Sequence, residues 1–400
     1  MTDFLQLHFL TFYPPSNLNR DDLGRPKSAI IGGSTRLRIS SQALKRAWRT
    51  SEKFEKLFTG LKGERTRRIG REIALSLQIN HGVSHDIAQK ISRVLASVFG
   101  KLDTTPKPGQ ELFIKQLAFI SPKEKNNLDA FLSKTLADDS LREALVAAAD
   151  EVDLDVEDEA DGNGNDTEDD KGRKRKKKQS KTTTKLLKAI REEVLTVSDT
   201  AVDIGMFGRM LADSPKFNRE AAVQVAHAVT THKTTIEDDY YTAVDDLKKP
   251  SEDAGAGFLG EAGFGAGVFY LYACINRDLL RQNLGGDDAL AGLACAALVE
   301  AAATVSPAGK QASFASRARA EYILAERGTD QPRALTAAFL KPVGEAEPDG
   351  MMAASIKELT KLRTALAQAY GDGTGPTAEM NIHTGKGTLE DIKAFCRAGV

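Results

Sequence analysis

The stretch GGSTRLRISSQALKRAWR, residues 32–49, decides the fold that we expect for this chain of 400 residues. Gly32-Gly33 predicts a tight two-residue turn, because glycine readily adopts the positive φ angles that such turns require. The alternating residues on either side of the turn predict a short hairpin. Arg36 and Arg38 alternate with apolar residues on its second strand, so both side chains are expected to leave the same face.

A helix follows the hairpin and is expected to run from Ser40 to Phe58. Ser40 or Ser41 can cap its N-terminus, where free backbone N–H groups favour a bound phosphate. Trp48, the only tryptophan, is expected in the core. One face of this helix carries basic residues, at Lys45, Arg49, Lys53 and Lys56.

The net charge of the chain conceals where its cations are. Lys and Arg number 55 against 56 Asp and Glu, a net charge of −1. Residues 150–170 carry about 12 acids and no base, whereas 171–181 carry about 8 bases and no acid. We expect 150–181 to be disordered, because blocks of like charge repel and bury no apolar surface. Residues 1–75 have a net charge of about +8, which is typical of a phosphate-binding surface or of a solvated basic face.

Strand and helix patterns mix along the rest of the chain without regular βαβ alternation, which predicts an α+β fold. Strands are expected at 4–12, 223–229, 268–275 and 319–325, and helices at 65–148, 185–194, 287–303, 334–340 and 355–370. The tail from Gly371 is expected to be loose. We interpret the glycine-rich segment before Val268 as a mobile loop that leads into a strand.

No catalytic or metal-binding set stands out in the sequence. Residues 255–260 match GxGxxG, but no strand precedes them and no helix follows, so dinucleotide binding is not expected. His227 and His232 lack the cysteine or carboxylate partners of a zinc site. His8 has no triad partner nearby in sequence, and we expect all three histidines to be structural. We predict no enzyme activity, no cofactor and no metal.

Three scattered cysteines fit a reducing cytosol, and we predict a cytoplasmic protein. The longest apolar stretch, 289–299, is too short to cross a membrane, so no membrane contact is expected. What remains is a set of basic and aromatic side chains. Cations on phosphates and rings under bases are the usual way in which proteins hold a single nucleic-acid strand. The pair Tyr240-Tyr241 fits base stacking and ordinary strand packing equally well.

Several long motifs, in this order, resemble the repeating backbone subunit of the type I-E CRISPR Cascade complex, the CasC family of the RAMP superfamily. They are SNLNRDD (16–22), GGSTRLRISSQALKRAWR (32–49), VDIGMFGRML (202–211), AHAVTTHK (226–233), YYTAVDDL (240–247) and GKQASFA (309–315). The resemblance runs from residue 4 to about 325, without 150–181.

This resemblance implies a right-hand architecture. An RRM-like, ferredoxin-like palm with a thumb hairpin is expected at 1–60 and 196–330, with the thumb at about 200–265. A helical fingers region is expected at 61–195, and a C-terminal helical segment with a loose tail at 331–400. Copies of the subunit would assemble head to tail along one CRISPR RNA and displace bases at intervals. The other bases would remain free to pair with a target DNA strand, and other Cascade subunits would be partners.

The resemblance also implies which residues contact the RNA. The backbone would lie against Lys45, Arg46 and Arg49, with Arg20, Arg36, Arg38 and Ser40 nearby. The displaced base would lie near Met210, Tyr240 and Tyr241, and Arg209, Lys310 and Gln311 complete the RNA-binding set. Two alternatives are a metal-dependent RAMP-type endoribonuclease, which would use an acid or His8, and a generic single-stranded nucleic-acid-binding protein.

Overall fold

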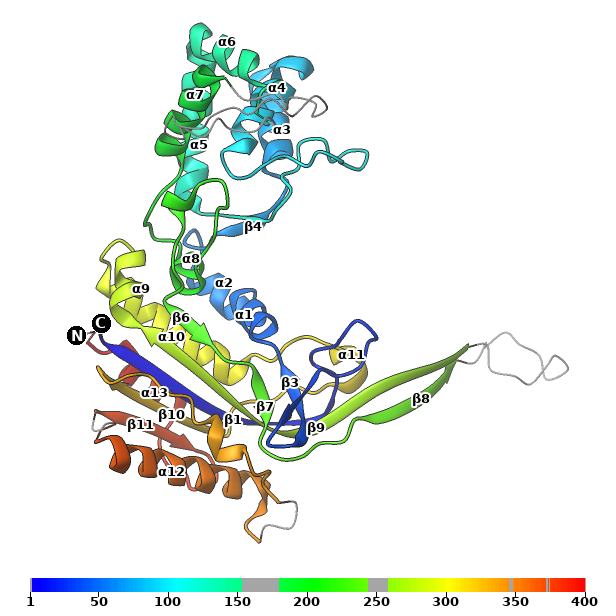
Figure 1. Ribbon diagram of the computed structural model, residues 1–400, viewed down its shortest axis with the longest axis vertical. Coiled ribbons are helices and arrows are strands. Elements are labelled where there is room, and N and C mark those ends of the chain that lie inside the picture. Colours follow the sequence, from blue (N-terminus) through cyan, green and yellow to red (C-terminus); the bar gives the residue numbers. More distant parts are fainter. Residues whose placement is uncertain are drawn as a thin grey trace, which may run out of the picture. The chain divides into compact units, whose positions relative to one another are not determined.

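The computed structural model describes residues 2–152, 180–243, 258–344, 348–371, 373 and 375–399 (Figure 1). They form two compact units: unit 1 is Met1–Thr59 with Ala222–Val400, and unit 2 is Gly60–Ala221. The mixed α+β class predicted from the sequence is confirmed. The boundaries differ from the expected ones, because 196–221 belongs to unit 2 and 331–400 belongs to unit 1.

Unit 1 is built on an antiparallel sheet whose central strand opens the chain. β1 lies between β9 and β10, and the order is β11-β10-β1-β9-β7-β3-β2, with β6 and β8 also pairing with β9. Apolar side chains on both faces explain why β1 is almost wholly buried. The strands are β1 Phe4–Ser16, β2 Ser28–Ile31, β3 Ser34–Ile39, β6 Val223–Val225, β7 Ala228–Thr230, β8 Glu237–Ala243, β9 Phe258–Asn276, β10 Tyr322–Gly328 and β11 Thr377–Asn381.

Helices cover this sheet, with α12 along one side and α10 along the other (Figure 1). Even-numbered residues of the central strands, such as Tyr270 and Tyr322, pack against α12 and the short η2 turn. The helices are α1 Ser41–Arg49, α2 Glu52–Leu57, α9 Arg277–Asn283, α10 Asp288–Thr304, α11 Gln311–Phe314, η2 Thr336–Phe339, α12 Gly350–Tyr370 and α13 Leu389–Arg397.

Unit 2 is a helical body with its own apolar core. Ile69, Ile73 and Leu77 recur every fourth residue and therefore share the buried face of α3. A two-stranded sheet, β4 Glu64–Thr66 with β5 Ala118–Ile120, joins the helices. The helices are α3 Ile69–His81, α4 His85–Ser97, α5 Pro122–Ala137, α6 Asp139–Ala148, α7 Lys181–Val194, α8 Val202–Phe207 and the η1 turn Pro215–Phe217.

The hairpin and helix expected around residue 40 are present, with one correction. Gly32 and Gly33 have φ angles of 57° and 74°, as the predicted turn requires. Trp48 is fully buried, as expected. The single long helix that was expected is divided, because Ser51 accepts a hydrogen bond from Phe54 N and so caps a second helix, α2.

The glycine-rich segment before Val268 is strand, so the expected mobile loop is wrong for the described residues 258–267. Gly263, Gly265 and Gly267 alternate along β9 and therefore share one face. A Cβ at position 265 would lie 2.7 Å from Leu37 Cδ1, and one at 267 would lie 2.4 Å from His232 Nε2. Glycine is needed here because neighbouring side chains occupy the space.

Two other expectations are corrected. The strand expected at 223–229 is two short strands, β6 and β7, which both pair with β9. The tail expected to be loose contains β11 and α13, and its Cys396 is buried.

Most of the segment 150–181, which was expected to be disordered, lies outside the described residues. At its two described ends, Ser180 N donates a hydrogen bond to Glu151 Oε2 at 3.0 Å. The chain therefore leaves and re-enters unit 2 at neighbouring positions.

Candidate nucleic-acid interface

The start of α1 is held firmly against the loop that precedes the hairpin. Ser40 Oγ accepts a hydrogen bond from Ala43 N at 3.3 Å, as the predicted cap requires. Ser40 N in turn donates to Asn19 Oδ1 at 2.8 Å. Arg20, next to Asn19, is exposed. These bonds place Arg20 and the capped end of α1 in one local structure.

The exposed side of α1 is basic. Leu44 and Trp48 are buried, whereas Lys45 and Arg49 are half-buried and Arg46 is exposed. Farther along, the cations of α2 are ion-paired: Lys53 Nζ lies 2.7 Å from Glu300 Oε1, and Lys56 Nζ lies 2.5 Å from Glu52 Oε1. The two lysines of α2 are therefore bound to carboxylates.

A second cationic cluster lies on the strands beside α1. Arg38 Nη1 lies 3.1 Å from His227 Nδ1, and Arg38 N donates to Lys27 O at 2.8 Å. Burial, together with the charges of Arg38 and Lys27, lowers the pKa of His227. No carboxylate pairs with these three side chains among the described residues. Cations without counter-ions at a surface are suited to bind phosphate.

The sequence analysis missed Lys27, and it expected His227 to be purely structural. The Gly32-Gly33 turn fixes the hairpin register so that Ser28 faces Leu37, and Lys27 accordingly comes opposite Arg38. The position of Lys27 opposite Arg38 therefore follows from the turn in the sequence. The position of His227 depends on the pairing of β7 with β3, which joins segments about 190 residues apart and has no local signal.

The structure corrects the expectation for Arg36. It was expected on the same accessible face as Arg38, but its side chain is fully buried. Its guanidinium donates to Thr230 O at 3.1 Å and to Phe339 O at 2.7 Å. The η2 segment, some 300 residues later in the chain, contributes the covering carbonyl and leaves no room for a phosphate at Arg36.

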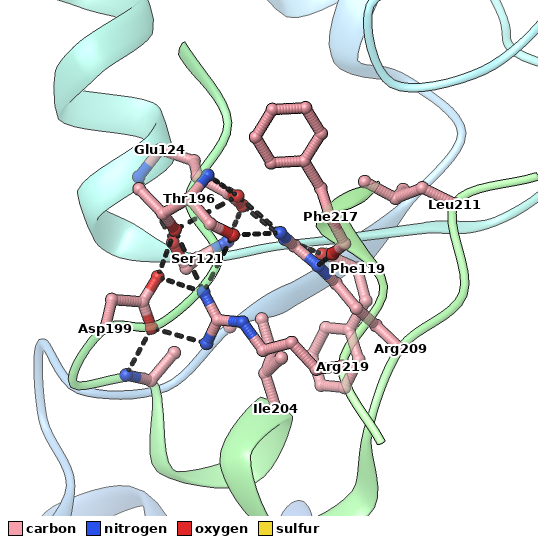
Figure 2. Close-up of polar contacts among 12 residues, drawn as sticks. Phe119, Ser121, Glu124, Thr196, Asp199, Ile204, Arg209, Leu211, Phe217 and Arg219 are labelled. Atoms are coloured by element: carbon pink, nitrogen blue, oxygen red, sulfur yellow. Dashed lines mark hydrogen bonds and ion pairs between the residues drawn. The ribbon is translucent and has the colours of Figure 1, made fainter. Parts of the chain in front are cut away.

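Arg209 is a second correction. It lies within unit 2, where its guanidinium binds Glu124 through contacts of 2.5 and 2.6 Å and also donates to Phe119 O, Phe217 O and Thr196 O (Figure 2). A second buried pair, Arg219 with Asp199, completes this network. Arg209 is therefore a structural residue, whereas the adjacent Met210 is 71% exposed.

Tyr240 and Tyr241 lie on β8, which forms a hairpin with β9. Both are exposed, Tyr240 at 69% and Tyr241 at 43%. Successive strand residues point to opposite faces, so the two rings leave the hairpin on different sides. Tyr241 pairs with Gly260, where a Cβ would meet its ring at 2.4 Å. Residues 244–257, between β8 and β9 in the sequence, lie outside the described residues.

The turn that carries Lys310 and Gln311 packs against the loop of Arg20. A Cβ at Gly309 would lie 2.4 Å from Leu18 O, so only glycine permits this approach. Lys310 has a φ angle of 52°, and Gln311 Nε2 donates to Pro307 O and Ser316 Oγ. Unit 1 thus gathers Arg20, Arg38, Ser40, α1 and this turn, whereas Arg209 and Met210 belong to unit 2.

His8 is structural, as expected, and lies at the end of a buried chain of hydrogen bonds. Leu335 N donates to the Tyr270 hydroxyl at 2.9 Å, so that hydroxyl can donate to His8 Nδ1 at 2.8 Å. His8 Nε2 then donates to Glu326 at 3.2 Å. Burial lowers the pKa of His8, which favours this neutral form. Glu326, whose pKa burial raises, is brought to about 2 by its bonds with His8 and Arg363.

Among the described residues, no group of three or more His, Cys, Asp and Glu side chains could hold a metal ion. No helix within the same ranges has the length and apolar character needed to cross a membrane.

Comparison with known proteins gives the family. A profile of the CT1975-like protein family, Cas_CT1975, matches residues 5–396. No curated protein matches the chain. A solved chain described as "CRISPR RNA-guided surveillance complex, pre-nicking" is 28% identical with a TM-score of 0.74, over 99% of this chain and 100% of that chain. Another, described as "CRISPR RNA-guided surveillance complex", is 25% identical with a TM-score of 0.66 and the same coverage.

The resemblance to a CRISPR surveillance-complex subunit, expected from the sequence motifs, is confirmed by these similarities. Because the profile extends over nearly the whole sequence, the chain belongs to the CT1975-like protein family.

Proposed function

We propose that this chain is the repeating CRISPR-RNA-binding backbone subunit of a type I-E Cascade complex. The observation that carries the proposal is the cluster of Lys27, Arg38 and His227 beside the capped start of α1. It brings together two cations and an imidazole from three strand regions without a carboxylate partner among the described residues. Such a surface binds the phosphates of any sequence, which suits a protein that leaves base recognition to base pairing.

In this proposal the parts of the molecule take the roles of a right hand. The sheet of unit 1 is the RRM-like palm, the β8–β9 hairpin is the thumb and unit 2 is the helical fingers region. The exposed rings of Tyr240 and Tyr241 on unit 1 are proposed to contact a displaced base, and the exposed Met210 is a separate proposed base contact on unit 2. Copies of the chain assemble head to tail along the guide, with other Cascade subunits as partners, and the undisplaced bases pair with target DNA.

We propose a binding role without catalysis. The endoribonuclease alternative relied on His8 or an acid, and the burial of His8 within its hydrogen-bonded chain argues against its use on a substrate. The localisation proposed with this role is the cytoplasm.

The test is to incubate the chain with CRISPR RNA and with complementary strands, with and without Mg²⁺, and to measure binding and strand integrity. We expect tight binding and intact strands under both conditions. Site-specific cleavage that one carboxylate or His8 substitution abolishes would establish the endoribonuclease instead. Binding without a defined assembly would establish a generic single-strand-binding protein.

A further inference from the structure

Unit 2 contains a pocket of about 260 Å³, of whose lining the proposed function uses only Met210. Its walls come from three segments: the segment after α4 at Phe99, the segment before β5 around Leu117, and the segment after α8 at Met210 and Leu211. Its volume is just below the roughly 300–1,000 Å³ of pockets that hold drug-sized ligands. A pocket of this size suits one flat ring better than a whole larger molecule.

The mouth of this pocket has an unusual surface. Leu117 is 61% exposed and Met210 is 71% exposed, although both are large apolar side chains. Exposed apolar groups that converge on one cavity indicate a binding surface more strongly than the same groups scattered singly. Behind them, Phe99 and Leu211 are buried and form an apolar wall.

Two lysines lie side by side at the same pocket. Lys115 N donates to Lys101 O at 2.8 Å, across the bridge that pairs Leu102 with Ile114. Both lysine side chains are exposed, and neither has an ion-pair partner among the described residues. Asp213 is held in place by Lys101 N, which donates to its Oδ2 at 3.1 Å. Cations beside an apolar slot complement a ligand that has a phosphate and a flat base.

The pocket wall is fixed before any ligand arrives. Leu211 follows Arg209 by two residues, and Arg209 is anchored by its contacts with Glu124, Phe119 and Phe217 (Figure 2). Leu211 N also donates to Asn218 Oδ1 at 2.6 Å. A wall fixed by buried charge-assisted bonds loses little conformational freedom on binding.

We propose that this pocket holds one nucleotide of a single strand, with its base against Leu117 and Met210 and its flanking phosphates on Lys101 and Lys115. The inference rests on the proposed function and deepens it by assigning unit 2 a nucleotide site of its own. RNA and DNA strands share this chemistry, and the experiment distinguishes between them.

The experiment uses the full chain with single strands that carry 5-iodouracil, in an RNA arm and a DNA arm. After irradiation, cross-linked peptides are identified by mass spectrometry. We expect cross-links at Phe99 in addition to Met210, and the arm in which they form identifies the strand. The inference is overturned when strands bind but neither arm gives a cross-link within 99–118, because a cross-link at Met210 alone is already expected from the proposed function. Absence of any strand binding would contradict the proposed function as well.

Variants add a second readout. K101A/K115A should reduce the salt dependence of binding by about 1.4 units of log Kd against log salt, at roughly 0.7 per phosphate on a single strand. L117S should weaken binding about fivefold without changing that slope. K185A/K188A removes the same charge from the exposed side of α7 and is the matched control. Equal changes in the salt dependence of binding in K101A/K115A and in K185A/K188A would refute the nucleotide site.

Discussion

His227 is the residue whose charge is most closely tied to phosphate binding. Its pKa is lowered by burial and by the cations Arg38 and Lys27, so the imidazole is mainly neutral at pH 7 in the free protein. A phosphate bound between these side chains would favour the protonated ring. Binding would then take up a proton, and affinity would rise as the pH falls.

We therefore predict that the affinity for RNA increases about three- to tenfold between pH 7.5 and pH 5.5, since one unit of pKa shift corresponds to a factor of about ten. H227Q should remove most of this dependence. The measurement is Kd by fluorescence anisotropy at both pH values and constant salt. An H227Q profile parallel to that of the wild type would exclude His227 from the phosphate site.

Arg209 supports a different prediction, about stability. R209M should destabilise unit 2 by about 3–5 kcal/mol, because Glu124 would remain buried without its partner. E124Q/R209M should lose less, since no charge is then left unpaired. K134A, which removes an exposed pair with Glu193, is the control and should cost less than about 1 kcal/mol. Thermal or urea unfolding measures all three, and equal losses in R209M and K134A would contradict this role.

Both arginine corrections have one physical cause. Arg36 and Arg209 belong to motifs whose spacing resembled a binding surface, but carbonyl groups and a carboxylate from distant segments surround them. A sequence shows which side chains share a strand face, and it does not show which later segment covers that face. Arg38, two residues from Arg36, is only half-buried.

At the scale of the element, α1 is the part of the interface that its sequence predicted best. The serine cap, the buried Leu44 and Trp48 and the basic side all follow from local pattern. The register of the β2–β3 hairpin follows from its two-residue turn. The break between α1 and α2 and the division of β6 from β7 depend on contacts that no helical or strand periodicity contains.

We predict that K45A/R49A weakens binding equally for unrelated RNA sequences and reduces the salt slope by about 1.4 units, because two phosphate contacts are lost on a single strand. K53A/K56A removes the same charge from α2, where the lysines contact Glu300 and Glu52, and is the matched control. The measurement is Kd over a series of salt concentrations. A slope unchanged in K45A/R49A would remove both residues from the interface.

At the scale of the whole molecule, the net charge of −1 is an average over unlike parts. The segment 150–181 contributes about −4 and the rest about +3. The basic character expected for the N-terminal region reappears in unit 1 as a local surface on α1 and the neighbouring strands. Total charge therefore says little about where a polyanion binds.

Deletion of 153–179 tests the independence of the charged segment. We expect soluble protein with a melting temperature close to that of the wild type, because Glu151 and Ser180 already lie within hydrogen-bond distance and a short join can close the gap. Thermal unfolding and gel filtration measure this outcome. Loss of folded protein would mean that the segment contributes to the core of unit 2.

The central claim is that this chain is a repeating subunit on a guide RNA. Native mass spectrometry of the chain with single-stranded RNAs of increasing length tests it most directly. We predict complexes in which the number of protein copies rises in regular steps with RNA length, and in which K45A/R49A reduces occupancy at every length. A single copy regardless of RNA length, or no RNA-bound species, would contradict the account.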